Sequence, residues 1–166
     1  VPGLVLDTVD DERLNQWKAV KRLITAEKFD EFLTKFKANL ALRPYIALHI
    51  ETSTPDESDE WLANQGKEGG VDVIGSELSG MSLTFGPNMN FTVYIPVDHK
   101  DTNNVPKEKV FELLKVIAES GVEVAIHNTA FEGPVLFNEF GKQWLDNGFC
   151  GFVPNWLDTK LEASYV

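Results

Sequence analysis

The chain has 166 residues, 43% of them hydrophobic, and a formal net charge of −11 at pH 7. This length suits one domain with a sizeable core, and no apolar run approaches the ~20 residues that span a bilayer, which argues against a membrane protein. The acidic balance argues against a broad basic surface that grips duplex nucleic acid. A single cysteine, Cys150, excludes an internal disulfide and fits a reducing compartment, so we expect a cytoplasmic location.

The first predicted elements are an arm, a strand and a helix. Residues 1–20 are acidic and lack the basic start and long apolar core of a signal peptide, so we expect an arm or linker there. A short strand is predicted over residues 21–25. Thr25 is a candidate N-cap, and Pro44 is expected to stop the helix that follows. Apolar residues recur at helical spacing between them, at Phe29, Phe32, Leu33, Phe36 and Leu40.

Three strands are predicted next. Residues 45–52 form an apolar strand, and the acidic, Ser- and Gly-rich stretch 53–75 is typical of a loop. Residues 78–85 and 91–97 are predicted to pair as a hairpin, because residues 86–90 carry strong turn chemistry.

The second half predicts helices alternating with a strand. Pro106 opens a helix that Gly121 ends, and a strand follows over residues 122–126. A short helix over residues 131–140, closed by Gly141, leads through a connection over 142–155 to a last helix over 156–165. This order predicts an α/β fold, in which helices pack on a mixed sheet.

Two predicted strands each deliver a carboxylate at their ends. Glu51 lies at the end of the apolar strand 45–52, and Glu132 lies shortly after strand 122–126. Carboxylates brought together from neighbouring strand ends can hold divalent cations against a phosphodiester. His49 stands where such a site would want an acid.

Several motifs resemble those of one family. His49-Ile50-Glu51-Thr52 is similar to Asp-x-Glu-Thr at a strand end, and Asn128-Thr129-Ala130-Phe131-Glu132 is similar to Asn-x-x-(Tyr/Phe)-Asp. Asp158-Thr159 opening a helix, and the hairpin segments 78–83 and 93–99, add to the likeness. From about residue 21 to its last residue, the chain resembles the 3'–5' proofreading exonuclease domain of family A (DNA polymerase I-like) DNA polymerases of bacteria and phages. These domains belong to the ribonuclease H-like DEDD exonucleases.

The resemblance implies a ribonuclease H-like mixed sheet flanked by helices over residues 21–166, and two-ion hydrolysis of terminal phosphodiesters with Mg²⁺ or Mn²⁺. The implied partners are the 3' end of single-stranded DNA and the polymerase domain of the same parent chain, in a bacterium or a phage-infected host. The implied catalytic and metal-binding residues are Glu51 and Glu132, with His49 at a catalytic position. The implied substrate-binding residues are Thr52, Asn128, Phe131 and Asp158.

Three departures from the family bear on activity. His49 replaces an aspartate that bridges both ions, and imidazole offers one neutral nitrogen that suits Zn²⁺ or Mn²⁺ better than Mg²⁺. Glu132 replaces an aspartate and moves the charge outward by one methylene. The family's last motif, a Tyr or His followed four residues later by Asp, is expected beyond Asp158 and is not found up to Val166. We therefore expect either a fragment of a longer polymerase or missing pieces that come from elsewhere, and weak cleavage or none by this chain.

Two other functions stay open beside the active exonuclease. One is a catalytically dead exonuclease-fold module with a structural or single-strand-binding role beside a polymerase. The other is an RNA-trimming exonuclease of the ribonuclease D type. Simpler interpretations of single residues also stay open: His49 as an ordinary strand histidine, Asp158 as a helix N-cap, and Phe131 as part of the core.

Overall fold

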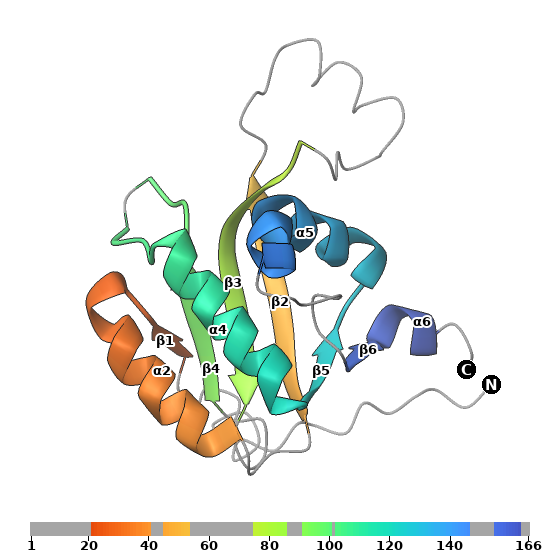
Figure 1. The fold of residues 1–166 in the computed structure, drawn as a ribbon, viewed down its shortest axis with the longest axis horizontal. Helices are drawn as coiled ribbons and strands as arrows, with labels where there is room; N and C mark the ends of the chain where they lie inside the picture. Colours follow the sequence, from red (N-terminus) through yellow and green to blue (C-terminus); the bar gives the residue numbers. More distant parts are fainter. Residues whose placement is uncertain are drawn as a thin grey trace, which may run out of the picture.

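Six strands form one mixed sheet in the order β1-β4-β3-β2-β5-β6 (Figure 1). The computed structural model describes residues 21–40, 45–53, 75–85, 91–100, 102–146 and 155–163. The predicted arm over 1–20, the stop at Pro44, most of the loop over 53–75 and the turn over 86–90 lie outside these ranges. The strands are β1 (Lys21–Leu23), β2 (Tyr45–Ser53), β3 (Glu77–Phe85), β4 (Phe91–Pro96), β5 (Glu123–Ile126) and β6 (Trp156–Asp158).

Strand direction follows from the pairing. β3 runs antiparallel to both of its neighbours, β2 and β4. The pairs β1–β4, β2–β5 and β5–β6 are parallel, so every strand except β3 points the same way. The predicted hairpin is confirmed as β3 and β4, and the predicted mixed sheet is confirmed with it.

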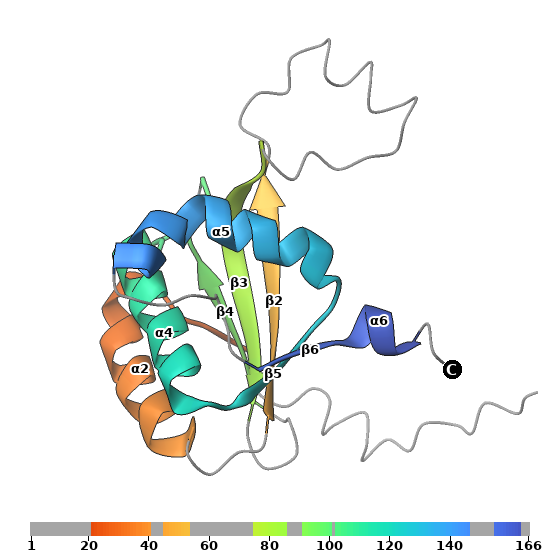
Figure 2. The same cartoon turned by 45° about the vertical axis from the view of Figure 1, so that its right-hand side comes forward.

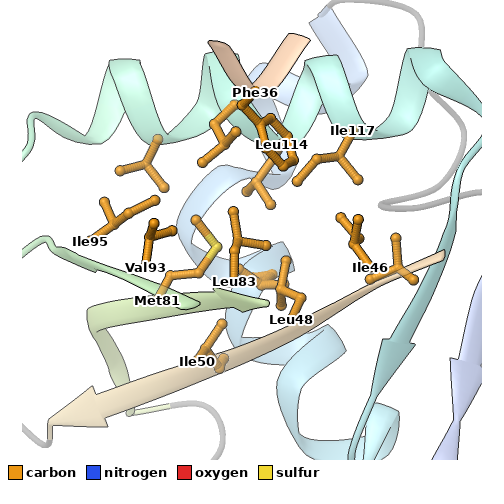
Figure 3. Packing of buried hydrophobic residues seen from close by; sticks show 14 of the residues in the cluster. Phe36, Ile46, Leu48, Ile50, Met81, Leu83, Val93, Ile95, Leu114 and Ile117 are labelled. Carbon is orange, nitrogen blue, oxygen red and sulfur yellow. The ribbon is translucent and has the colours of Figure 1, made fainter. Parts of the chain in front are cut away.

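One face of the sheet carries the apolar core. In β2 the residues Ile46, Leu48 and Ile50 are buried and alternate with more exposed ones. Figure 3 shows these side chains packed with those of β3 and β4 beneath two helices, α2 (Ala26–Leu40) and α4 (Lys107–Ser120). Each fully buried aliphatic side chain contributes about 1.5–3 kcal/mol relative to exposure. The opposite face of β2 keeps its alternate residues, His49 and Glu51, in contact with solvent.

Helices α2 and α4 form where the apolar periodicity predicts them. Pro106 stands at the N-cap of α4, and Gly121 ends the helix with a left-handed φ of 69° and an N–H donated to the Ala118 carbonyl. Residue 121 needs this φ to leave the helix, which glycine adopts at little cost. No helix within the described ranges is long and apolar enough to cross a membrane.

The structure corrects the predicted end of the next helix. Helix α5 covers Thr129–Asp146 and runs through Gly141, so the prediction of a stop at Gly141 was wrong. The Phe137 ring lies over Gly141, since a Cβ at position 141 would be only 3.1 Å from it. Trp144, only 2% exposed and 5.6 Å from the Phe111 ring, anchors the last turns of α5 to α4.

The prediction of one helix over residues 156–165 was also wrong in its first part. Trp156, Leu157 and Asp158 form β6, paired in parallel with Val124–Ile126, and helix α6 covers only Thr159–Ala163. The free backbone edge of β5 supplies hydrogen-bond partners to this segment, and sheet pairing therefore prevails over a helical apolar pattern.

Candidate functional site

The carboxyl ends of three parallel strands lie at one edge of the sheet. β2 pairs with β5 and β5 pairs with β6, in registers such as Ala47 with Ala125 and Ile126 with Asp158. Helix α5 begins directly after β5 and passes near the end of β2 (Figure 2). In open α/β sheets such an edge is the usual place for a ligand site.

One contact at this edge joins His49 in β2 to Glu132 in α5. His49 Nδ1 lies 2.7 Å from Glu132 Oε1. The His49 side chain is 61% exposed and that of Glu132 only 1%. Glu132 stands in the first turn of α5 and also accepts a hydrogen bond from the backbone N–H of Ile50. The pair therefore ties the end of β2 to the start of α5.

Burial dominates the electrostatics of Glu132. Loss of water around the carboxyl raises its pKa above the ordinary 4.5, although the His49 ring and the Ile50 N–H both favour the charged form. The negative charge of Asp158 adds to the increase. One oxygen, Glu132 Oε2, is buried without a hydrogen-bond partner in the structure, which costs free energy for as long as nothing contacts it.

Glu51 takes part in a different network, on the side of the sheet toward β4. Tyr94 donates a hydrogen bond of 3.0 Å to Glu51 Oε2, and its hydroxyl lies 2.6 Å from His99 Nε2. The side chain of Asn104 holds the backbone of His99 in place. It accepts a hydrogen bond from the His99 N–H and donates one to the His99 carbonyl. No sequence pattern singles out Tyr94, because its role depends on the register between β3 and β4.

Gly80 makes room for that network. A Cβ at position 80 would lie 1.9 Å from the Tyr94 hydroxyl oxygen, so any side chain there would displace the ring. Tyr94 itself pairs with Ser82, which pairs in turn with His49. The phenol therefore leans diagonally across the glycine to reach Glu51. Burial, followed by the hydrogen bond to Glu51, raises the pKa of Tyr94 to about 12.

Asp158 acts as a cap for two helices. Its carboxylate accepts hydrogen bonds from the backbone N–H groups of Asn128 and Thr129 at the start of α5, and from those of Lys160 and Leu161 in α6. The Thr129 hydroxyl adds the largest single effect, and together these donors hold the pKa of Asp158 well below its usual range. This geometry agrees with the simpler interpretation of Asp158 as an N-cap.

The other predicted residues lie close by. Asn128 has a left-handed φ of 69°, and its carbonyl accepts from the Phe131 and Glu132 N–H groups. Thr52 is half-buried and follows a register shift in β2. Phe131 is half-buried and packs against the core, which leaves both interpretations of it open. His127, to which the sequence assigned no catalytic role, is exposed and contacts the Thr159 hydroxyl.

The residues at this edge do not fit a pair of Mg²⁺ ions. Within the described parts of the chain, no group of three or more His, Cys, Asp and Glu side chains is placed to hold a metal ion. His49 stands where a bridging carboxylate is expected, and its Nδ1 contacts Glu132 Oε1. Mg²⁺ requires several oxygen ligands in near-octahedral geometry, which imidazole cannot supply.

Comparison with known proteins gives likenesses in structure alone. No family model matches the sequence, and no curated protein matches it. Pop2p of S. pombe, in a form with Mg²⁺ and Mn²⁺ bound, is 11% identical with a TM-score of 0.55 over 88% of this chain and 76% of that chain. The EXO domain of Nibbler from Aedes aegypti is 14% identical with a TM-score of 0.54 over 90% and 56%. The RNase domain of yeast Pop2 is 11% identical with a TM-score of 0.56 over 91% and 72%.

These likenesses define the class of fold. The chain has a ribonuclease H-like fold, a mixed sheet of six strands flanked by helices, as the sequence predicted. It spans little more than half, 56%, of the Nibbler chain. At identities this low the likeness carries the fold and leaves the activity to be argued from the site.

Proposed function

We propose that the chain is a 3'–5' exonuclease-type domain of a family A DNA polymerase, which binds the 3' end of single-stranded DNA. The observation that carries the proposal is the meeting of three motif segments at one sheet edge: His49 to Thr52, Asn128 to Glu132, and Asp158 with Thr159. These are the segments that resemble the family. Pop2p, whose structure holds Mg²⁺ and Mn²⁺, supports divalent ions as the cofactors of such a fold.

The proposed roles of the binding residues come from the resemblance to the family. The Asn128 amide and the Thr52 hydroxyl lie at the two strand ends that flank the proposed 3' end. Phe131 would stack on an unpaired base, a contact that contributes about 1–3 kcal/mol per base without sequence preference. A chain of net charge −11 binds nucleic acid poorly through its overall field. Local contacts of this kind must therefore supply the affinity.

Cleavage by the chain as it stands is expected to be weak. Two divalent ions supply an activated water and a stabilised leaving oxygen in enzymes of this type. Here His49 offers no bridging carboxylate, and Glu132 is engaged by His49. Loss of one catalytic group that acts with others commonly removes most of the rate.

A second candidate function is a catalytically dead module that binds single strands beside a polymerase. The His49–Glu132 contact favours it, because His49 engages Glu132 Oε1, one of the oxygens that the family's mechanism would need for an ion. Binding would then remain although cleavage is absent.

One experiment tests both candidates. Fluorescently labelled single-stranded DNA, duplex DNA and single-stranded RNA are mixed with the protein, with Mg²⁺, with Mn²⁺ or with chelator. Binding is measured by anisotropy and shortening on sequencing gels. Preference for single-stranded DNA together with slow loss from the 3' end supports the exonuclease. Binding without shortening supports the dead module, and preference for RNA favours the RNA-trimming alternative. If the protein shows no binding and no shortening, the proposal is refuted.

A further inference from the structure

A groove lies between β1 and α2, and we call it the β1–α2 groove. Its volume is about 720 Å³, and its walls come from residues 22–24, from one side of α2 and from the strands β3 and β4. β1 and β6 stand at the two ends of the strand order, and Figure 1 shows α2 with β1 on one side of the molecule and β6 on the other. None of the residues proposed for DNA binding lines the groove, so it is a separate surface.

The first wall of the groove belongs to an edge strand. Within the described ranges, β1 pairs with β4 alone, and no strand pairs with its other edge. The Ile24 N–H donates to the Tyr94 carbonyl over 2.8 Å. Because successive backbone groups of a strand point to opposite edges, the N–H and carbonyl of Leu23 face away from β4. An extended chain laid along this edge would therefore pair with β1 as a further strand.

One end of the groove is aromatic. Phe91 is the first residue of β4, which places it beside the start of β1. Its ring stacks on that of Phe85 with the ring centres 6.1 Å apart, and Phe85 contacts the rings of Phe32 and Phe36 in α2. Phe91 is 37% exposed, so the cluster has a face in contact with solvent. An apolar side chain that covers this face is stabilised by withdrawal from water.

The rest of the groove is basic, in a protein that is acidic as a whole. Arg22, Lys28 and Lys35 line it, and Glu31 is the one acid among the described residues of its lining. Glu31 pairs with Lys35, and this hydrogen bond, followed by the charges of Arg22 and Lys28, lowers the pKa of Glu31. Three cations against one acid leave an excess of positive charge, whereas the whole chain carries −11. An anionic ligand is therefore attracted to this groove and repelled by the protein's overall charge.

The length of the groove suits a short extended segment. Lys28 and Asn39 both line it, and α2 rises about 16 Å between them. About five residues of a β-strand cover the same distance. A peptide strand is therefore able to contact the free edge of β1, the cations and the aromatic end at once.

We propose that the β1–α2 groove binds an extended acidic segment of a partner protein, which adds to the sheet as a strand beside β1. Its acidic side chains meet the three cations, and an apolar side chain covers Phe91. A second copy of this chain paired through β1 would bring the cations of both copies together, which disfavours self-association. Single-stranded nucleic acid would match the charge, but it has no peptide backbone to complete the sheet.

Synthetic peptides test the groove. The probe is a fluorescent peptide of about eight residues that alternates Glu with Val and ends in Phe, long enough to span the groove. We expect it to bind, as measured by anisotropy, and we expect the same peptide with Lys in place of every Glu not to bind. Two further forms are N-methylated, one at every Glu and one at every Val, so that each lacks the N–H groups of one edge. One of these two forms should lose binding, because only one edge of the peptide pairs with β1.

Two charge reversals locate the binding on the protein. Lys28→Glu should weaken binding of the Glu peptide about fivefold, because repulsion replaces attraction at one exposed position. Lys142→Glu makes the same change of charge on the exposed surface of α5 and should leave the affinity unchanged. Amide hydrogen exchange of the wild-type protein needs no variant. The Leu23 amide should exchange fast in the free protein and slowly in the presence of the Glu peptide.

Several results would each overturn the proposal. They are no binding of the Glu peptide, equal binding of the Lys peptide, full binding of both N-methylated forms, equal weakening by the two charge reversals, and no protection of the Leu23 amide. Displacement of the peptide by single-stranded DNA would assign the groove to nucleic acid instead. A Leu23 amide that exchanges slowly before any peptide is added would show that this chain or a second copy occupies the edge. The peptide measurements contain no DNA, so their failure leaves the DNA-binding proposal standing.

Discussion

The imidazole of His49 and the carboxyl of Glu132 lie 2.7 Å apart, although 83 positions separate them in the sequence. The contact places an exposed, titratable ring in front of a buried acid at the point where β2 meets α5. Because burial is the largest influence on Glu132, the charge of this acid opposes folding and the histidine offsets part of that cost.

The pH dependence of stability should report the buried acid. The pKa of Glu132 is raised in the folded state, so the folded protein keeps this proton to a higher pH than the unfolded chain, whose carboxyl titrates near 4.5. The unfolding free energy of the wild type should therefore fall, relative to Glu132→Gln, as the pH rises above about 4.5. Urea unfolding at several pH values measures the difference. Glu119→Gln, on the exposed surface of α4, is the control, and a difference independent of pH would contradict the assignment.

Asp158 should show the opposite dependence. Its pKa is depressed in the folded state, so its contribution to stability is present above the unfolded value, 3.8, and is lost as the pH falls below it. Asp158→Asn should lower the melting temperature at pH 7, because the N–H groups at the start of α5 and in α6 lose a charged acceptor. The difference in melting temperature between Asp158→Asn and wild type should disappear as the pH is lowered into the acid range. A gap that widens on acidification would rule out the capping role.

The Tyr94–Glu51 contact should be visible by ultraviolet titration. The pKa of Tyr94 is about 12 rather than the ordinary 10.0. Subtracting the Tyr94→Phe curve from the wild-type curve isolates this phenol. Glu51→Gln should move the isolated midpoint toward 10, because the neighbouring negative charge is removed. Gly80→Ala should displace the Tyr94 ring and also move the midpoint toward 10. An unchanged midpoint in both variants would exclude the contact between Tyr94 and Glu51.

Two substitutions at Asn128 separate its backbone from its amide. The left-handed φ of 69° favours glycine or asparagine. Asn128→Gly should keep the stability of the protein, whereas Asn128→Ala should cost about 1 kcal/mol. If the amide contacts the 3' end, both variants should bind single-stranded DNA several-fold more weakly. Full affinity in a folded Asn128→Gly protein would remove Asn128 from the DNA site.

Apolar periodicity predicted the parts of the fold that bury one continuous face. The helical spacing from Phe29 to Leu40 and the alternation in residues 45–52 have unambiguous periods, and both elements are present. β6 has three residues, too few to show alternation, and its strand conformation is stabilised by pairing with β5. The predicted helix end at Gly141 was wrong because a glycine marks a helix end only where the chain needs a left-handed φ, as at Gly121.

The candidate site was predictable as a set of segments but not as a set of contacts. Motif spacing located His49, Glu51, Asn128, Glu132 and Asp158, and parallel pairing of β2, β5 and β6 brings their segments to one edge. Which side chain contacts which depends on register and on the exit of α5 from β5. That is why the link from Tyr94 to Glu51 across Gly80 has no counterpart in the sequence pattern. The catalytic and metal-binding roles of these residues stay predictions.

The most direct test of the account is Mg²⁺-dependent loss of nucleotides from the 3' end of single-stranded DNA by His49→Asp and by wild type. The substitution restores the carboxylate that the family uses to bridge two ions. Circular dichroism and DNA anisotropy first establish that both proteins fold and bind. We predict that His49→Asp cleaves at least about tenfold faster, since one such ligand commonly controls orders of magnitude in rate. Equal rates in two folded, DNA-binding proteins would contradict the claim that His49 limits an exonuclease-type site.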